Sequence, residues 1–190
     1  MNAWFWWSYG GLWMLVLIQA AVVLLLLRQV GLIHLQIIQS VAGNAGLAIG
    51  EKVPDFLLLD VDDPELRIES PAKNGRPLVL IFMKPDCPAC KKGAAAIERV
   101  KYDANAIADW AVVLFSDKEE CVAFRAAHGL TDLALCQDAA GLGKAFGVTR
   151  VPFGFFIDEE GVIRSKGPVS STSSLQRLIA DGLPSSVVTD

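Results

Sequence analysis

The sequence lacks an excess of basic residues and has few cysteines, and each shortage argues against a class of function. Its 190 residues include 17 Lys or Arg against 21 Asp or Glu, which gives a net charge of −4 at pH 7. A nucleic-acid-binding surface is basic, so we expect no nucleic-acid partner. Two of the four cysteines stand alone in the sequence, which argues against a small scaffold stapled by disulfides.

Charged residues are also missing from the start of the chain, where no Asp, Glu, Lys or Arg precedes Arg28. Residues 11–28 are apolar except for Gln19 and the terminal arginine, and this run is about long enough to cross a bilayer as a helix. Residues 1–10 are rich in aromatic side chains, which is typical of a membrane interface. A cleaved signal peptide would carry an early Lys or Arg, so we predict an uncleaved anchor in inner-membrane lipid.

The chain after the anchor is predicted to have two parts. Residues 29–48 keep a helical apolar spacing and then become a linker of small residues. Residues 49–190 alternate short apolar runs with helix-favouring segments, which predicts an α/β domain with a central mixed β-sheet and helices on both faces. Strands are expected at 57–59, 66–68, 78–83, 110–115, 133–136, 154–157 and 162–166, helices at 93–100, 117–128, 141–146 and 173–181, and a tight turn at 74–75.

The segment Cys87-Pro88-Ala89-Cys90 follows the apolar run 78–83 and precedes an Ala-rich helix. A Cys-x-x-Cys in this position indicates a thioredoxin-like redox site. Unpaired N–H groups and the dipole at a helix start favour the thiolate, which is the nucleophile, and Pro88 suits the first helical position. We predict a catalytic pair that closes into a Cys87–Cys90 disulfide, with Cys87 attacking and Cys90 resolving. Half of a zinc site and a structural disulfide are the alternatives, but the sequence has no second ligand pair, so we expect no metal and no cofactor.

Charged residues beside the cysteines have opposing effects. Asp86 disfavours the Cys87 thiolate, whereas three nearby lysines favour it: Lys84, Lys91 and Lys92. Thioredoxin has a buried acid in the preceding strand, where this chain has Ile81. Peroxiredoxins have a threonine three residues before the reactive cysteine, where this chain has Lys84, so we expect no peroxidase activity.

The dipeptide Val151-Pro152 precedes the predicted strand 154–157. Thioredoxin-like proteins carry a cis-proline here that faces the Cys-x-x-Cys, and Pro152 occupies the matching position. Proline is the residue that makes a cis bond accessible. The backbone of Val151 would then bind an extended substrate segment. An ordinary trans-proline at the start of the strand is the alternative.

Cys121 and Cys136 fall in a predicted helix and a predicted strand. A lone cysteine is most often a small buried hydrophobic residue. A second disulfide between these two is the alternative, and sequence spacing does not decide it.

Over essentially its whole length the sequence resembles the MauD family of methylamine-utilisation proteins. The resemblance rests on the apolar anchor, segments 28–34 and 54–56, Cys87-Pro88-Ala89-Cys90-Lys91-Lys92 and Val151-Pro152-Phe153. It implies a thioredoxin-like fold and a periplasmic role in maturing methylamine dehydrogenase, whose small subunit carries several disulfides and a tryptophan-derived quinone. The implied partners are this small subunit as protein substrate and a membrane or periplasmic redox partner.

Two other functions and the direction of electron flow stay open. A protein of this fold could reduce apocytochrome thiols in cytochrome c maturation, or it could hold a partner subunit without catalysis. Known Cys-x-x-Cys proteins range from reductants to strong oxidants, so the motif does not give the direction.

The anchor is predicted to be single-pass, with residues 1–9 in the cytoplasm and the domain from Ile49 onward in the periplasm. Arg28 is a weak contrary signal under the positive-inside rule, but long domains translocate largely regardless of charge. A disulfide donor would also have little lasting effect in a reducing cytoplasm.

Overall fold

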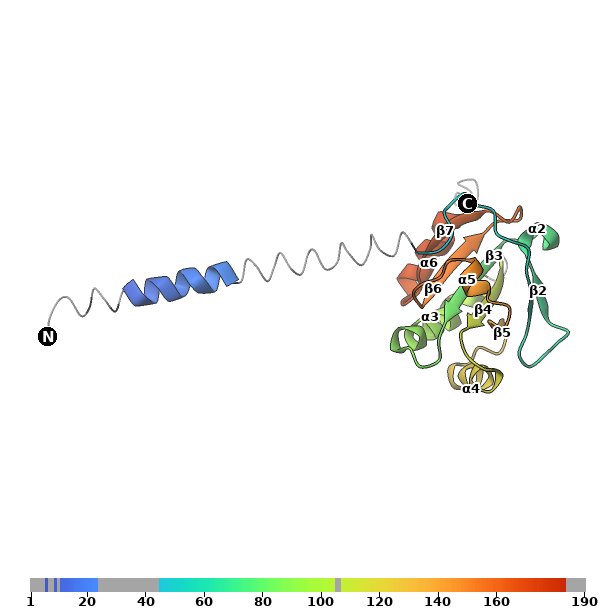
Figure 1. Ribbon diagram of the computed structural model, residues 1–190, viewed down its shortest axis with the longest axis horizontal. Helices are drawn as coiled ribbons and strands as arrows, with labels where there is room; N and C mark the ends of the chain where they lie inside the picture. The colour runs from blue at the N-terminus through green and yellow to red at the C-terminus, as the bar shows by residue number, and fades with distance from the viewer. Residues whose placement is uncertain (1–5, 7–8, 10, 24–44, 105–106, 184–190) are drawn as a thin grey trace. The chain divides into compact units, whose positions relative to one another are not determined.

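The computed structural model describes residues 6, 9, 11–23, 45–104 and 107–183, and the chain divides into two compact units, Met1–Ala42 and Gly43–Asp190. Figure 1 draws both units.

In the first unit, residues 11–23 are helical, and the rings of Tyr9 and Trp13 meet edge to face with their centroids 6.2 Å apart. Among the residues described, no helix is both long enough and apolar enough to cross a membrane. Residues 24–28 of the predicted anchor and 29–44 of the predicted juxtamembrane segment lie outside the described residues.

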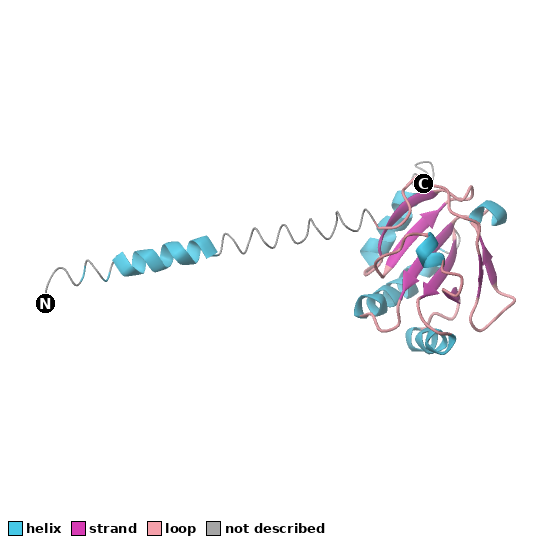
Figure 2. Ribbon diagram, in the orientation of Figure 1, coloured by secondary structure: helices cyan, strands magenta, loops and turns pink. Residues whose placement is uncertain are grey.

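The second unit is built on a five-stranded mixed sheet with the strand order β5-β4-β3-β6-β7 (Figures 1 and 2). The central strand β3 (Leu78–Met83) is parallel to β4 (Asp109–Leu114) and antiparallel to β6 (Phe153–Ile157). The outer strands are β5 (Ala134–Gln137), parallel to β4, and β7 (Ile163–Pro168), antiparallel to β6. All six side chains of β3 are buried, as its unbroken apolar run predicted, because both faces of the sheet are covered.

Helices and a small hairpin surround this sheet (Figure 2). They are α2 (Pro71–Asn74), α3 (Pro88–Ala104), α4 (Lys118–His128), α5 (Leu142–Ala145), α6 (Thr172–Gly182), and the antiparallel strands β1 (Leu57–Leu59) and β2 (Arg67–Glu69). The sequence located all of these except α2, for which it predicted only a tight turn. Pro71 begins that short helix, and Gly75 ends it in the left-handed conformation with φ of 69°.

The two faces of the sheet carry different cores. On one face α3, α4 and α6 pack against alternate side chains of the strands, and Ile81 and Val112 belong to this core. On the other face α5 and the start of the domain cover a core rich in phenylalanine. There the rings of Phe146 and Phe155 lie 5.2 Å apart, and Phe82 contacts both. Helices therefore lie on both faces, as predicted, with the longer ones on the face that carries α3.

The packed part of the domain begins before Ile49. The N–H of Gly46 donates to the carbonyl of Gly147 at 3.0 Å. The Lys166 ammonium donates to the three carbonyl oxygens of residues 45–47 at 3.1, 3.2 and 2.8 Å. These contacts place residues 45–47, which the sequence assigned to the linker, within the folded domain.

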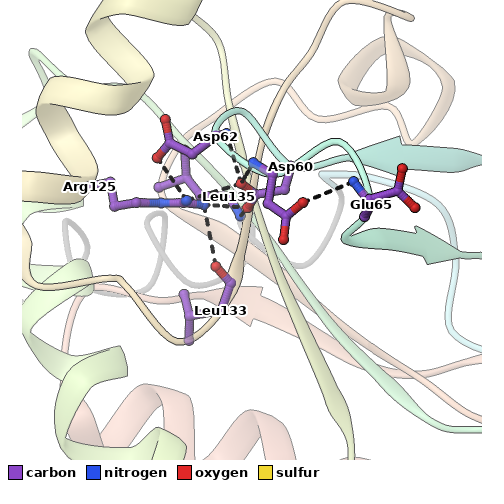
Figure 3. Close-up of polar contacts among 7 residues, drawn as sticks. Asp60, Asp62, Glu65, Arg125, Leu133 and Leu135 are labelled. Carbon is purple, nitrogen blue, oxygen red and sulfur yellow. Dashed lines mark hydrogen bonds and ion pairs between the residues drawn. The ribbon is translucent and has the colours of Figure 1, made fainter.

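A buried ion pair holds the hairpin against the sheet (Figure 3). Arg125 of α4 donates to both carboxylate oxygens of Asp60, whose side chain is fully buried, and to Asp62 at 2.9 Å. The Asp60 carboxylate also accepts the N–H of Leu135 in β5 at 2.9 Å. Burial alone would raise the pKa of Asp60, but hydrogen bonds from Arg125 and from backbone N–H groups outweigh it and lower the pKa below its ordinary value of 3.8.

Candidate active site

The paired cysteines lie where the chain leaves β3 and enters α3. The helix begins at Pro88, which is the first helical position that the sequence predicted. Cys87 is half-buried, whereas Cys90, one turn further along, is fully buried. Both thiols are free in this structure. Of the two sulfurs, that of Cys87 is therefore the one that a substrate can reach.

Two hydrogen bonds define the surroundings of the Cys87 sulfur. The backbone N–H of Cys90 donates to the Cys87 Sγ at 3.2 Å. An N–H group directed at the sulfur from the first turn of a helix stabilises negative charge on it. The Cys87 thiol in turn donates to the carbonyl oxygen of Val151 at 3.9 Å. The structure thus brings together the two motifs that the sequence singled out, which lie more than sixty residues apart.

Cys90 has a very different environment. Burial raises the pKa of the Cys90 thiol to about 12, and its contact with Cys87 and the charge of Asp86 act in the same direction. A backbone hydrogen bond at Lys84 opposes this shift without reversing it. At neutral pH Cys90 is a buried, protonated thiol, which suits a residue that reacts only after its neighbour has done so.

The peptide bond between Val151 and Pro152 is cis, as predicted. Val151 is half-buried beside Cys87, and Pro152 is buried. The carbonyl of Pro152 accepts the N–H of Val169 at 3.3 Å, and Val169 itself is fully buried. No motif marks Val169, because its place beside the site arises only from the packing of the segment between β7 and α6.

The remaining predicted site residues are neighbours of the cysteines in the sequence. Lys84, Asp86, Pro88 and Lys91 are exposed, and Ala89 is half-buried. Their effects on the thiols stay predictions, apart from the effects on Cys90 of the Asp86 charge and of the Lys84 backbone described above.

The strand position at which thioredoxin carries an acid is Ile81 here, and it is fully buried in the core that also contains Cys90. The buried surroundings of the cysteine pair are therefore apolar at the position of Ile81.

Cys121 and Cys136 pack in the cores on opposite faces of the sheet, so the sheet itself separates them. Burial raises the pKa of Cys121 to about 11 and that of Cys136 to about 12. Both are free and fully buried, so the structure selects the first of the two alternatives, buried hydrophobic thiols. Across the described ranges, no three His, Cys, Asp or Glu side chains gather as a possible metal site.

Comparisons with known proteins agree with this geometry. Residues 48–179 match the Redoxin family. The methylamine utilization protein MauD of Methylorubrum extorquens is 35% identical over 172 residues, which cover 88% of this chain and 82% of that protein. MauD of Paracoccus denitrificans is 33% identical over 172 residues, covering 88% and 84%.

Solved structures show the same fold at low sequence identity. A thiol:disulfide interchange protein of the thioredoxin family from Chlorobium tepidum aligns with a TM-score of 0.60 and 19% identity, covering 73% of this chain and 99% of that one. StoA from Bacillus subtilis aligns with a TM-score of 0.56 and 24% identity, covering 66% and 96%.

The fold is therefore thioredoxin-like, and it holds a Cys-x-x-Cys pair with one accessible and one buried thiol at the start of a helix. This pair makes the chain a thiol–disulfide oxidoreductase. The match to the Redoxin model and the identity to the two MauD proteins extend over most of the chain, which therefore belongs to the Redoxin family and to the MauD family of methylamine utilization proteins.

Proposed function

We propose that this oxidoreductase forms or rearranges disulfides in the small, quinone-bearing subunit of methylamine dehydrogenase. The observation that carries the proposal is the pairing of an accessible Cys87 with a fully buried Cys90, beside the backbone carbonyl of Val151. The similarity to proteins named for methylamine utilisation supports the choice of substrate. A subunit with several disulfides needs an agent that pairs its cysteines correctly.

In the oxidising direction, the reaction starts from the Cys87–Cys90 disulfide. A substrate thiolate attacks the Cys87 Sγ, the S–S bond breaks, and Cys90 leaves as a thiolate that takes up a proton. A second substrate thiolate then attacks the substrate sulfur of the mixed disulfide, and Cys87 leaves. The substrate has lost two electrons and two protons, and the cysteine pair has gained them. A membrane or periplasmic redox partner must then remove them for the next cycle.

Rearrangement needs no net electron transfer. The Cys87 thiolate attacks a substrate disulfide and forms a mixed disulfide, and another substrate thiol displaces it. If no substrate thiol displaces Cys87, Cys90 attacks the Cys87 sulfur. This attack releases the substrate in reduced form and closes the Cys87–Cys90 disulfide.

Substrate binding is proposed to use the backbone beside Val151. Its carbonyl lies 3.9 Å from the Cys87 sulfur, so an extended substrate segment that pairs with this backbone would carry its own sulfur past Cys87. Pro152 has no N–H group to donate, so the hydrogen bonds to the substrate segment would come from the neighbouring backbone groups.

The proposal is tested in a strain that makes methylamine dehydrogenase and lacks this chain. We expect the small subunit to accumulate with free or mispaired thiols, and we expect the wild-type chain, but not Cys87→Ser, to restore its disulfides. The measurement is mass spectrometry of alkylated small subunit. Normal disulfides in the deletion strain, together with a loss of c-type cytochromes, would instead support the function in cytochrome c maturation.

We further propose that the chain is anchored in the inner membrane, with residues 1–10 as an interfacial segment, 11–28 as a single membrane-spanning helix, 29–44 as a connection and 45–190 as the periplasmic domain. The length and apolar character of residues 11–28 support the anchor, and the redox chemistry supports the periplasm.

Alkaline phosphatase fused after Asp190 tests this placement, because that enzyme becomes active only where its own disulfides form. We expect high phosphatase activity. An inactive fusion, with fluorescence from a cytoplasmic-type reporter at the same junction, would show that the domain faces the other way.

A further inference from the structure

Gly93, one turn into α3 beyond Cys90, lies directly against the backbone of the segment between β7 and α6. A Cβ atom built on Gly93 would lie 2.4 Å from the carbonyl oxygen of Val169 and 3.1 Å from the Cε of Met83. Ordinary contacts of a Cβ begin at 3.4 Å. Gly93 lies within a regular helix, so its missing side chain serves close approach rather than an unusual backbone conformation.

Val169 connects this contact to the backbone beside the active-site sulfur. Its N–H donates to the carbonyl of Pro152 at 3.3 Å, and the residue is fully buried. Its side chain lies over a second glycine, Gly154, where an added Cβ would come within 2.7 Å of the Val169 Cγ2. Val169 thus lies between Gly93 of α3 on one side and Pro152 and Gly154 on the other.

We propose that Gly93 is a positioning residue, whose bare Cα sets the gap between the Cys87 sulfur and the Val151 carbonyl. The inference rests on the disulfide exchange proposed above. Cys87 directly precedes α3, the helix that contains Gly93. Val151 directly precedes Pro152, whose carbonyl accepts the N–H of Val169. The separation of α3 from Val169 therefore fixes where a substrate segment bound along Val151 meets the sulfur.

A methyl group at Gly93 would disturb this gap in a specific way. The nearest obstacle is a backbone oxygen, so no side-chain rotation relieves the overlap, and α3 and Val169 must separate by about 1 Å. A misplacement of this size between reacting groups can lower a rate by about a hundredfold. A small reagent that needs only the Cys87 thiolate does not depend on the gap.

The experiment compares two rates in the wild-type chain and in Gly93→Ala. One is exchange with a disulfide-bonded peptide, and the other is alkylation of Cys87 by iodoacetamide. We expect the peptide rate to fall by about tenfold to a hundredfold, and the alkylation rate to stay within about twofold.

Gly182→Ala is the matched control, because it adds a methyl group at another closely packed glycine that has no proposed role at the active site. Its Cβ would lie 2.4 Å from the ring of Phe156, so it should strain the core comparably. Gly182 lines a hollow with Pro77 and Asp158, at the end of β3 and β6 away from the cysteines. We expect its ratio of peptide rate to alkylation rate to match the wild type.

The outcomes separate the two proposals. A wild-type chain that does not exchange with peptides contradicts the proposed function itself. An active wild type with an unchanged ratio in Gly93→Ala, or an equal change in Gly182→Ala, overturns the positioning role alone. If Gly93→Ala does not fold, Val169→Pro removes the N–H that holds Pro152 and should lower the same ratio. Failure of both to fold beside a folded Gly182→Ala shows that the contact is only structural, which also overturns the proposal.

Discussion

Replacing Cys87 with serine is expected to abolish disulfide exchange while the domain stays folded. The half-buried Cys87 sulfur is the accessible one of the pair, and Cys90 is fully buried with its pKa raised to about 12, so Cys90 cannot take over the attack. A serine hydroxyl has nearly the same size but is not a nucleophile at neutral pH. We expect the exchange rate with a disulfide-bonded peptide to fall by about a thousandfold or more, to the uncatalysed background.

The matched control is Cys121→Ala, which removes a different thiol. Cys121 is fully buried in α4 and is not part of the Cys-x-x-Cys pair. We therefore expect the exchange rate of Cys121→Ala to stay within about twofold of the wild type, with only a loss of stability. Circular dichroism establishes that both variants fold. Exchange that survives in Cys87→Ser, or is lost in Cys121→Ala, would contradict the assignment of the attacking thiol.

Replacing Asp60 with alanine is expected to lower the free energy of unfolding far more than replacing its neighbour Asp62. The change removes the fully buried carboxylate that accepts hydrogen bonds from Arg125 and Leu135, and it leaves the Arg125 side chain, only 12% exposed, with Asp62 alone as an acidic partner. Breaking a buried ion pair by removing one partner costs about 3–5 kcal/mol. The free energy of unfolding of the full-length chain, from urea titration followed by circular dichroism, measures the loss.

The loss should depend on pH in a defined direction. The pKa of Asp60 lies below its ordinary value of 3.8 in the folded chain, so its contribution is fully present at pH 7. As the pH falls below that value, the unfolded chain takes up the proton first, and the difference between wild type and Asp60→Ala shrinks.

Asp62→Ala serves as the control for this prediction. Its side chain is 43% exposed and contacts the same arginine, so we expect a loss of about 1 kcal/mol or less. Equal losses of unfolding free energy in the two variants would show that the burial of Asp60 adds nothing to its contribution to stability, which would contradict the prediction.

Local sequence patterns predicted the parts of this domain that depend on neighbours in the chain. The unbroken apolar run of β3 required burial on both faces, and the helix predicted at 117–128 is α4, Lys118–His128. At the site, the Cys-x-x-Cys before a helix predicted an accessible and a buried thiol. The cis bond beside them was predicted from the matching cis-proline of thioredoxin-like proteins.

The features that depend on contacts between distant segments were not predictable in this way. Cys121 and Cys136 could be placed on opposite faces only once the packing of α4 and the register of β5 were known. The anchoring role of Asp60 depends on an arginine 65 residues further along the chain. Gly93 looked like part of an ordinary helix start, because nothing in the sequence shows that a backbone carbonyl lies against it.

The most direct test of the proposed exchange with the amine dehydrogenase subunit is to trap it in cells with Cys90→Ser. Without the resolving thiol, a mixed disulfide between Cys87 and its substrate should persist. We predict that non-reducing purification followed by mass spectrometry finds Cys87 joined to a cysteine of the methylamine dehydrogenase small subunit, and that Cys87→Ser captures nothing. Capture of apocytochromes instead, or the same captured subunit in the Cys87→Ser chain, would contradict the account.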